Sequence, residues 1–184
     1  MCYTFQFTND PIGLRVKLMS RLYGEFAMAS LQTKVDDFLA QKRIAVAGVS
    51  RTQQAAANAI YKRLREVGYE VFAVNPNADE IGGDKCYHDL KSIPGGVDAV
   101  FIATRPEATE QLVRQCSEAG IKRVWMHRSF HAFGTSVSEE AVKYCQEHDI
   151  TVIAGACPLM FGKPSDGAHR FMRGMLGMFG KLPN

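Results

Sequence analysis

The chain has 184 residues, which is long enough for one well-buried domain and short for two. Its net charge is only +3 and no basic run exceeds two residues, which argues against nucleic acid as a partner. Hydrophobic residues make up 46% of the chain, in runs that fall short of the roughly 18 residues needed to cross a membrane. We therefore expect one globular domain that binds neither nucleic acid nor a membrane.

The cysteines predict neither a disulfide framework nor a metal centre, because their number is odd and no pair has C-x-x-C spacing. Free thiols are typical of a reducing compartment, and the N-terminus has no secretory apolar core. We therefore predict a cytoplasmic protein without a bound metal. The five cysteines are Cys2, Cys86, Cys116, Cys145 and Cys157.

The N-terminal part of the chain differs from the rest, because it has no sustained helical or strand periodicity. We interpret residues 1–29 as a poorly ordered extension and residues 30–184 as the folded domain with a C-terminal helical tail. Two alternatives remain open for the extension. Either it is dispensable and Met28 is the natural start, or residues 14–26 form a short helix that packs on a neighbour.

From residue 30 onward, helical and strand patterns alternate. Helices are predicted where apolar residues recur every three to four positions, and strands where short apolar runs end at turn residues. The predicted helices cover residues 35–39, 55–67, 106–119, 138–148 and 165–179. The predicted strands cover residues 44–47, 69–74, 99–103, 124–126 and 151–154, with a short edge strand at 86–87.

Strands that are separated by helices pair in parallel, because parallel neighbours need a long crossover connection. We therefore predict an α/β fold: a Rossmann-like open parallel sheet of about five strands with helices on both faces. This is the fold class of NAD(P)-binding domains, in which ligands bind at the carboxyl ends of the strands. The residues that follow each strand are therefore the candidate binding residues.

The loop after the first strand has the features of a phosphate site. Gly48 allows a tight turn and close approach of the backbone. Ser50 supplies a hydroxyl, Arg51 supplies a fixed positive charge, and the N–H groups at a helix start attract anions. We predict that Gly48, Val49, Ser50 and Arg51 bind phosphate.

This loop is not the dinucleotide fingerprint, because residues 48–53 contain one glycine where G-x-G-x-x-G has three. The second strand ends at Asn75, where NAD-binding domains place a carboxylate for the ribose. Both departures argue against NAD. They are compatible with a ligand that carries a phosphate on its ribose, which a carboxylate would repel. Coenzyme A and NADP are such ligands.

The ordered series of strand-end phrases resembles the CoA-binding domain family, which is related to the CoA-binding domain of the succinyl-CoA synthetase alpha subunit. The likeness extends from about residue 38 to 182. Each phrase alone has little specificity, but each falls at the expected strand end. The phrases are residues 44–50, 68–76, 97–100, 125–130 and 155–160.

The resemblance implies that the chain binds coenzyme A or an acyl-CoA, with NADP as a less favoured cofactor. The loop of residues 48–51 would hold the pyrophosphate, and Asn77 departs from the lysine that related loops often carry near phosphate. The second domain that carries the phosphorylated histidine of the ligases has no counterpart here. The other implied binding residues are Asn75, Pro76, Asn77, Ala103, Thr104, Arg105, Pro106, His127 and Arg128.

Two of the strand-end residues have reactive side chains. Cys157 would face the pantetheine end of the ligand and could form a mixed disulfide, and His127 could act as a general base. The alternative for each is a buried residue without a chemical role, and we favour that alternative. No paired acid and base is evident in the sequence, so a catalytic function is not predicted from these residues alone.

The tail of the chain is predicted to be a helix capped by Ser165 or Asp166. Its broad apolar stripe could lie on a membrane surface, dock in a partner's groove, or pack on its own domain or a second copy. We favour packing on protein, including a homodimer through this helix. The stripe comprises Phe171, Met172, Met175, Leu176, Met178 and Phe179.

Three functions remain open at this stage. The first is a non-catalytic CoA-binding or regulatory module. The second is an NADP-linked or acyl-CoA-processing enzyme that uses Cys157 or His127. The third is an interaction protein whose nucleotide site is vestigial.

Overall fold

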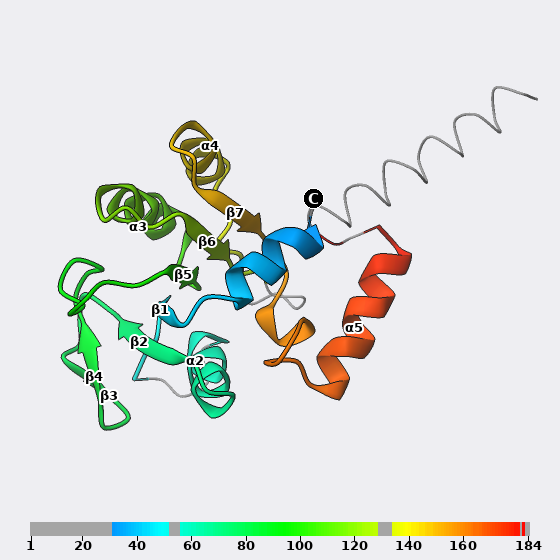
Figure 1. The fold of residues 1–184 in the computed structure, drawn as a ribbon, viewed down its shortest axis with the longest axis horizontal. Helices are drawn as coiled ribbons and strands as arrows, with labels where there is room; N and C mark the ends of the chain where they lie inside the picture. The colour runs from blue at the N-terminus through cyan, green and yellow to red at the C-terminus, as the bar shows by residue number, and fades with distance from the viewer. Residues whose placement is uncertain (1–30, 52–55, 129–133, 181, 183–184) are drawn as a thin grey trace, which may run out of the picture.

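The computed structural model of the chain describes residues 31–51, 56–128, 134–180 and 182 (Figure 1). The predicted N-terminal extension, residues 1–29, lies outside the described residues. Within these ranges the chain forms one sheet with helices packed on both of its faces. No helix among them has both the length and the apolar character required to cross a membrane.

The sheet has seven strands in the order β3-β4-β2-β1-β5-β6-β7. All neighbouring strands are parallel except β3 and β4, which form an antiparallel hairpin at one edge. The strands are β1 (Arg43–Ala47), β2 (Glu70–Val74), β3 (Glu80–Ile81), β4 (Asp84–Tyr87), β5 (Ala99–Ile102), β6 (Arg123–Met126) and β7 (Thr151–Ala154).

The predicted open, largely parallel sheet is confirmed, but the predicted number of about five strands is too low. The predicted strand at 86–87 is present and longer than predicted, as β4, but it is not the edge strand, because β3 pairs on its outer side. Strand β3 was missed because it has only two residues and one of them, Glu80, is exposed. A strand that short and polar has no periodicity to detect, and only its pairing with β4 defines it.

The predicted helices are present, and their ends shift by one or two residues, except that the first begins at least four residues earlier than predicted and the short helix η1 was not predicted. The first described helical segment covers residues 31–39. The C-terminal helix begins at Gly167, because Asp166 is the capping residue and its side chain accepts a hydrogen bond from the His169 N–H. The others are α2 (Ala56–Glu66), α3 (Pro106–Glu118), α4 (Glu139–Glu147), η1 (Pro158–Met160) and α5 (Gly167–Met178).

Alternate residues of the central strands face two separate apolar cores. On β1, Ile44 and Val46 pack on the face that also holds the helix 31–39, α2 and η1. Ala45 and Ala47 point to the other face, which α3 and α4 cover. Since all side chains of β5, and all but the first of β1 and β6, are buried on one face or the other, these three strands appear in the sequence as apolar runs.

Trp125 on β6 contacts both the first core and the backbone that follows β7. Its ring makes edge-on contacts with Phe38 and Phe161, at centroid distances of 5.3 and 5.7 Å. Its indole Nε1–H donates to the Gly155 carbonyl at 2.8 Å. The core therefore fixes the backbone at the carboxyl end of β7, where ligand-facing residues are expected.

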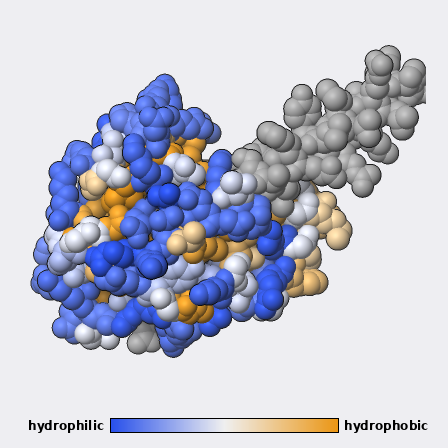
Figure 2. All heavy atoms as spheres, in the orientation of Figure 1, coloured by the Kyte–Doolittle hydropathy of each residue, from blue (hydrophilic) through white to orange (hydrophobic). Residues whose placement is uncertain are grey.

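Helix α5 packs on the domain through one narrow face. Leu176 is buried in the first core, and the Arg173 Nη2 donates to Gln32 Oε1 at 2.6 Å. The opposite face is apolar and exposed, and pale orange side chains line this part of the surface in Figure 2. Its exposed large residues are Phe171, Met175, Met178 and, just past the helix, Phe179.

Candidate functional site

The strand order brings five strand-end loops into one row. The chain runs outward from β1 to β2 and then returns to place β5 on the other side of β1. The direction reverses between β1 and β5, and ligands of open parallel sheets bind in the crevice at such a reversal. The predicted loops after β2, β1, β5, β6 and β7 thus follow one another along the carboxyl ends of the strands (Figure 1).

Gly48 is required by the packing of two of these loops. Its φ is +99°, a conformation that side chains disfavour, and its N–H donates to the Val74 carbonyl at 3.1 Å. A Cβ at this position would lie 2.3 Å from the Ala103 carbonyl oxygen. The close approach therefore occurs between the β1 and β5 loops of the protein itself, whether or not a ligand is bound.

Side-chain amides hold the two residues that follow Gly48. Asn75 Nδ2 donates to the Val49 carbonyl at 2.7 Å. The Ser50 N–H donates to Asn58 Oδ1 at 2.8 Å, and Asn58 Nδ2 donates back to the Ser50 carbonyl at 2.6 Å. Consequently the N–H of Ser50 already has an acceptor within the protein.

Asn58 was not predicted as a site residue. It lies in the first turn of α2, eight residues after Ser50, in a stretch that otherwise shows the apolar spacing of a helix. The one sequence signal is the residue type, because asparagine side chains near a helix start often bond to nearby backbone. That signal indicates a local bond but does not say which loop receives it.

Asn75 also shapes its own loop. Its Oδ1 accepts a hydrogen bond from the Asn77 N–H at 2.9 Å, which forms a tight turn over Pro76. Pro76 and Asn77 are exposed. Because both ends of the Asn75 amide are bonded within the protein, this side chain is not arranged to grip a ribose diol as a carboxylate would.

The loop after β5 leads directly into α3. The Ala103 N–H donates to the Ala47 carbonyl at 2.9 Å, which extends the pairing of β1 and β5 by one residue. Arg105 is the N-cap of α3 with extended backbone and no side-chain capping bond, and Pro106 is the first helical residue. The Thr104 hydroxyl lies 3.1 Å from the Thr109 hydroxyl, which orients this turn.

His127 is buried at the end of β6. Only 8% of its surface is exposed, and its ring lies edge-on to Phe101 at 5.8 Å. Burial lowers the pKa of the His127 imidazole, so the neutral form predominates near pH 7. The neighbouring Arg128 is exposed and pairs with Thr135 through an isolated bridge.

The backbone after β7 is strained where it reaches the site. Ala156 adopts a φ of +60°, a left-handed conformation that is uncommon for a residue with a Cβ. Cys157 follows it and is buried, and this burial raises the pKa of its thiol to about 11. At pH 7 only about one molecule in ten thousand would carry the reactive thiolate. The structure therefore does not activate Cys157 as a nucleophile.

Positive charge gathers at this end of the sheet. Arg51, Arg105 and Arg128, which we call the strand-end arginines, are exposed and follow β1, β5 and β6. None of them has an ion-pair partner among the described residues. A polyanionic ligand at this end would therefore meet guanidinium groups that no carboxylate neutralises.

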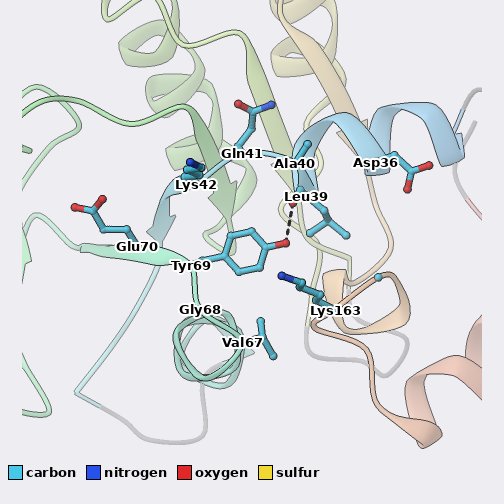
Figure 3. A pocket seen from close by; sticks show the side chains of 11 residues that line it. Asp36, Leu39, Ala40, Gln41, Lys42, Val67, Gly68, Tyr69, Glu70 and Lys163 are labelled. Carbon is cyan, nitrogen blue, oxygen red and sulfur yellow. Dashed lines mark hydrogen bonds between the residues drawn. The ribbon is translucent and has the colours of Figure 1, made fainter.

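A cavity of about 670 Å³ lies at the opposite, amino ends of the strands (Figure 3). It is bounded by the end of the helix 31–39, the turn 67–70 and residues 162–163. Tyr69 crosses it and donates its hydroxyl to the Leu39 carbonyl at 2.8 Å. Lysines and carboxylates alternate around it, so its field does not favour a polyanion.

The described residues contain no group of three or more His, Cys, Asp or Glu side chains that could hold a metal ion. The four described cysteines are free thiols, and all four are buried.

Comparisons with known proteins agree with this geometry. A model of the family described as "CoA binding domain" matches residues 42–163, which include every strand-end loop described above. A hypothetical protein from Pyrococcus horikoshii has a solved structure that superposes with a TM-score of 0.61 at 29% identity. The match covers 70% of this chain and 87% of that protein.

Two curated relatives differ in how much of their own length the match covers. The uncharacterized protein YneT of Bacillus subtilis is 32% identical over 116 residues, which are 63% of this chain and 82% of YneT. The alpha subunit of the ADP-forming acetate–CoA ligase II of Pyrococcus furiosus is 29% identical over 130 residues. Those residues are 67% of this chain but only 28% of the ligase subunit, so the chain corresponds to one part of a longer enzyme.

Proposed function

The chain belongs to the CoA-binding domain family, and we propose that it binds coenzyme A or an acyl-CoA as a non-catalytic binding or regulatory module. The observation that carries this proposal is the set of strand-end arginines without ion-pair partners, at the edge where the chain reverses. Coenzyme A bears a pyrophosphate and a ribose 3′-phosphate, so three guanidinium groups match its charge.

The same loops disfavour NAD. A ribose diol is recognised by a carboxylate at the end of the second strand, whereas Asn75 uses its amide to brace two loops. We propose that the ligand contacts the predicted strand-end residues from Gly48 to Arg128. In this proposal Arg51 lies near the pyrophosphate and Arg105 and Arg128 near the remaining phosphates.

A non-catalytic role fits the state of the Cys157 thiol. Burial holds the pKa of Cys157 far above neutrality, so the reactive thiolate is scarce at pH 7. A binding module does not need that thiolate. We also propose a cytoplasmic location, which agrees with the free thiols of the described cysteines.

The test is isothermal titration calorimetry of the full chain with coenzyme A, NADP and NAD at one salt concentration. We expect coenzyme A to bind at micromolar or lower Kd, and NADP and NAD to bind at least tenfold more weakly. A preference for NADP would instead support a reductase. Absence of binding with all three would support an interaction protein whose site is vestigial.

We propose a homodimer through the exposed face of α5. Phe171 and Met178 are 72% and 80% exposed, which is unusual for large apolar side chains unless a partner covers them. Analytical ultracentrifugation of the full chain and of Phe171→Glu tests this. We expect the dimer to dissociate in the variant, and a wild-type chain that remains monomeric at high concentration would contradict the proposal.

A further inference from the structure

One peptide unit of the predicted phosphate loop is held from both sides. The Val49 carbonyl accepts from Asn75, and the Ser50 N–H donates to Asn58. These two groups belong to the same trans peptide unit, so they point in opposite directions. Asn75 comes from the end of β2 and Asn58 from the first turn of α2, so the unit is fixed between strand and helix.

Asn58 fixes the next peptide unit as well. Its Nδ2 donates to the Ser50 carbonyl at 2.6 Å, and in a trans unit the following N–H, that of Arg51, points the opposite way. The N–H groups of Gly48 and Ser50 already have acceptors. Those of Val49 and Arg51 have none within the part of the chain that the structure describes.

We propose that Asn58 is a positioning residue that turns the Arg51 N–H away from α2, so that this group donates to the diphosphate of the bound ligand. The inference rests on the proposed function, since coenzyme A supplies the diphosphate. Asn58 acts through its two hydrogen bonds to the Ser50 backbone. Its contribution is preorganisation: a donor that is already oriented binds an anion without a further cost of ordering.

The experiment compares the full-length wild type with Asn58→Ala, using coenzyme A and inorganic pyrophosphate as probes. We expect the Kd of both probes to rise about tenfold, which corresponds to about 1.4 kcal/mol. The matched control is Gln115→Ala. It removes an amide that likewise braces the backbone, accepting from the Leu90 N–H at 3.2 Å, but from the far end of α3. The control should bind both probes like the wild type.

A second measurement does not depend on a variant. Amide hydrogen exchange followed by NMR should show that coenzyme A slows exchange of the Arg51 N–H at least tenfold in the wild type. The positioning role is refuted if Asn58→Ala binds both probes as the wild type does. It is equally refuted if the Arg51 amide exchanges at the same rate with and without coenzyme A.

These measurements distinguish a failure of the proposed function from a failure of the Asn58 positioning role alone. A wild-type chain that binds neither probe refutes the proposed function, and the positioning role with it. A wild-type chain that binds coenzyme A, with an affinity that does not change in Asn58→Ala, refutes the positioning role alone. A Kd increase confined to coenzyme A, with pyrophosphate unaffected, also refutes it, because the diphosphate is then not the group that Asn58 serves.

Discussion

The two ends of the parallel strands use arginine in opposite ways. At the amino ends, Arg43 forms an ion pair with Glu70, and Arg123 forms one with Asp37 at 2.8 Å. At the carboxyl ends, the strand-end arginines have no such partner among the described residues. Within the described ranges, the same residue type is therefore paired at one end of the sheet and unpaired at the other, and this difference supports the proposal that the ligand binds at the carboxyl end.

Arg43 has several partners within the protein. Besides Glu70, it donates to the carbonyls of Pro94 and Gly96 at 2.6 and 2.9 Å, and its guanidinium lies over the Phe72 ring. Three of its five N–H donors and one face of its guanidinium are therefore used within the protein. Charge alone is thus a poor guide to a binding site, and the number of partners that a charged group already has is a better one.

The largest effect is expected for Gly48→Ala. The new Cβ would overlap the Ala103 backbone, so this change should cost about 3 kcal/mol or more of unfolding free energy. The control is Gly68→Ala, which has a similar φ of +95° but no atom within 4 Å of the new Cβ, and should cost only about 1 kcal/mol. Urea denaturation measures both, and equal losses would show that the β1–β5 loop contact is not tight.

Single substitutions of one arginine at each end of the strands test the difference between the two ends. Arg43→Ala should lower the unfolding free energy by about 1–2 kcal/mol and leave the Kd for coenzyme A unchanged. Arg105→Ala should raise that Kd about tenfold while its unfolding free energy stays within about 0.5 kcal/mol of wild type. Calorimetry and urea denaturation of both variants decide this, and the reverse pattern would overturn the assignment of the two ends.

The pH dependence of stability reports the state of His127. Its folded pKa is lowered, so the unfolded chain binds a proton more readily once the pH falls below the usual value of 6.5. Stability should therefore be lost as the pH drops below 6.5, with a slope of at most about 1.4 kcal/mol per pH unit from this group. His127→Phe should remove that part of the slope, and an unchanged slope in urea titrations would show that His127 is not the group responsible.

The smallest effect concerns the thiol at the end of β7. Because burial raises the pKa of Cys157 to about 11, iodoacetamide at pH 8 should alkylate it at least about 100-fold more slowly than a free cysteine. Peptide mass mapping over time measures the rate. If Cys157 in the folded chain is alkylated as fast as a free cysteine, its thiol is available to act as a nucleophile, which contradicts this prediction.

The strand-end loops could be predicted from the sequence, because each follows a short apolar run. Gly48 was singled out correctly as a position that needs glycine. The group that approaches Gly48 could not be predicted, because it is the backbone of Ala103, 55 residues later in the chain. Such a contact depends on the order of the strands in the sheet. Strand β3 was missed because its two residues carry no pattern.

The bracing amides could not be predicted for the same physical reason. Asn75 was expected to line the ligand, but its side chain reaches the β1 loop, and Asn58 reaches the same loop from a helix. Residue type shows that a side chain can bond to the backbone, whereas the partner is chosen by packing in three dimensions. The raised pKa of Cys157 likewise depends on burial that only the fold supplies.

The most direct test of the assignment is to map the bound ligand on the isotope-labelled full chain by two-dimensional NMR while coenzyme A is added. We predict that amide shifts concentrate at the carboxyl ends of the strands, at Arg51, Thr104 and Arg128, and leave Arg43 and Arg123 unmoved. Shifts centred instead on Tyr69 and the cavity at the amino ends would contradict the account, because the site would then lie where the arginines are already paired.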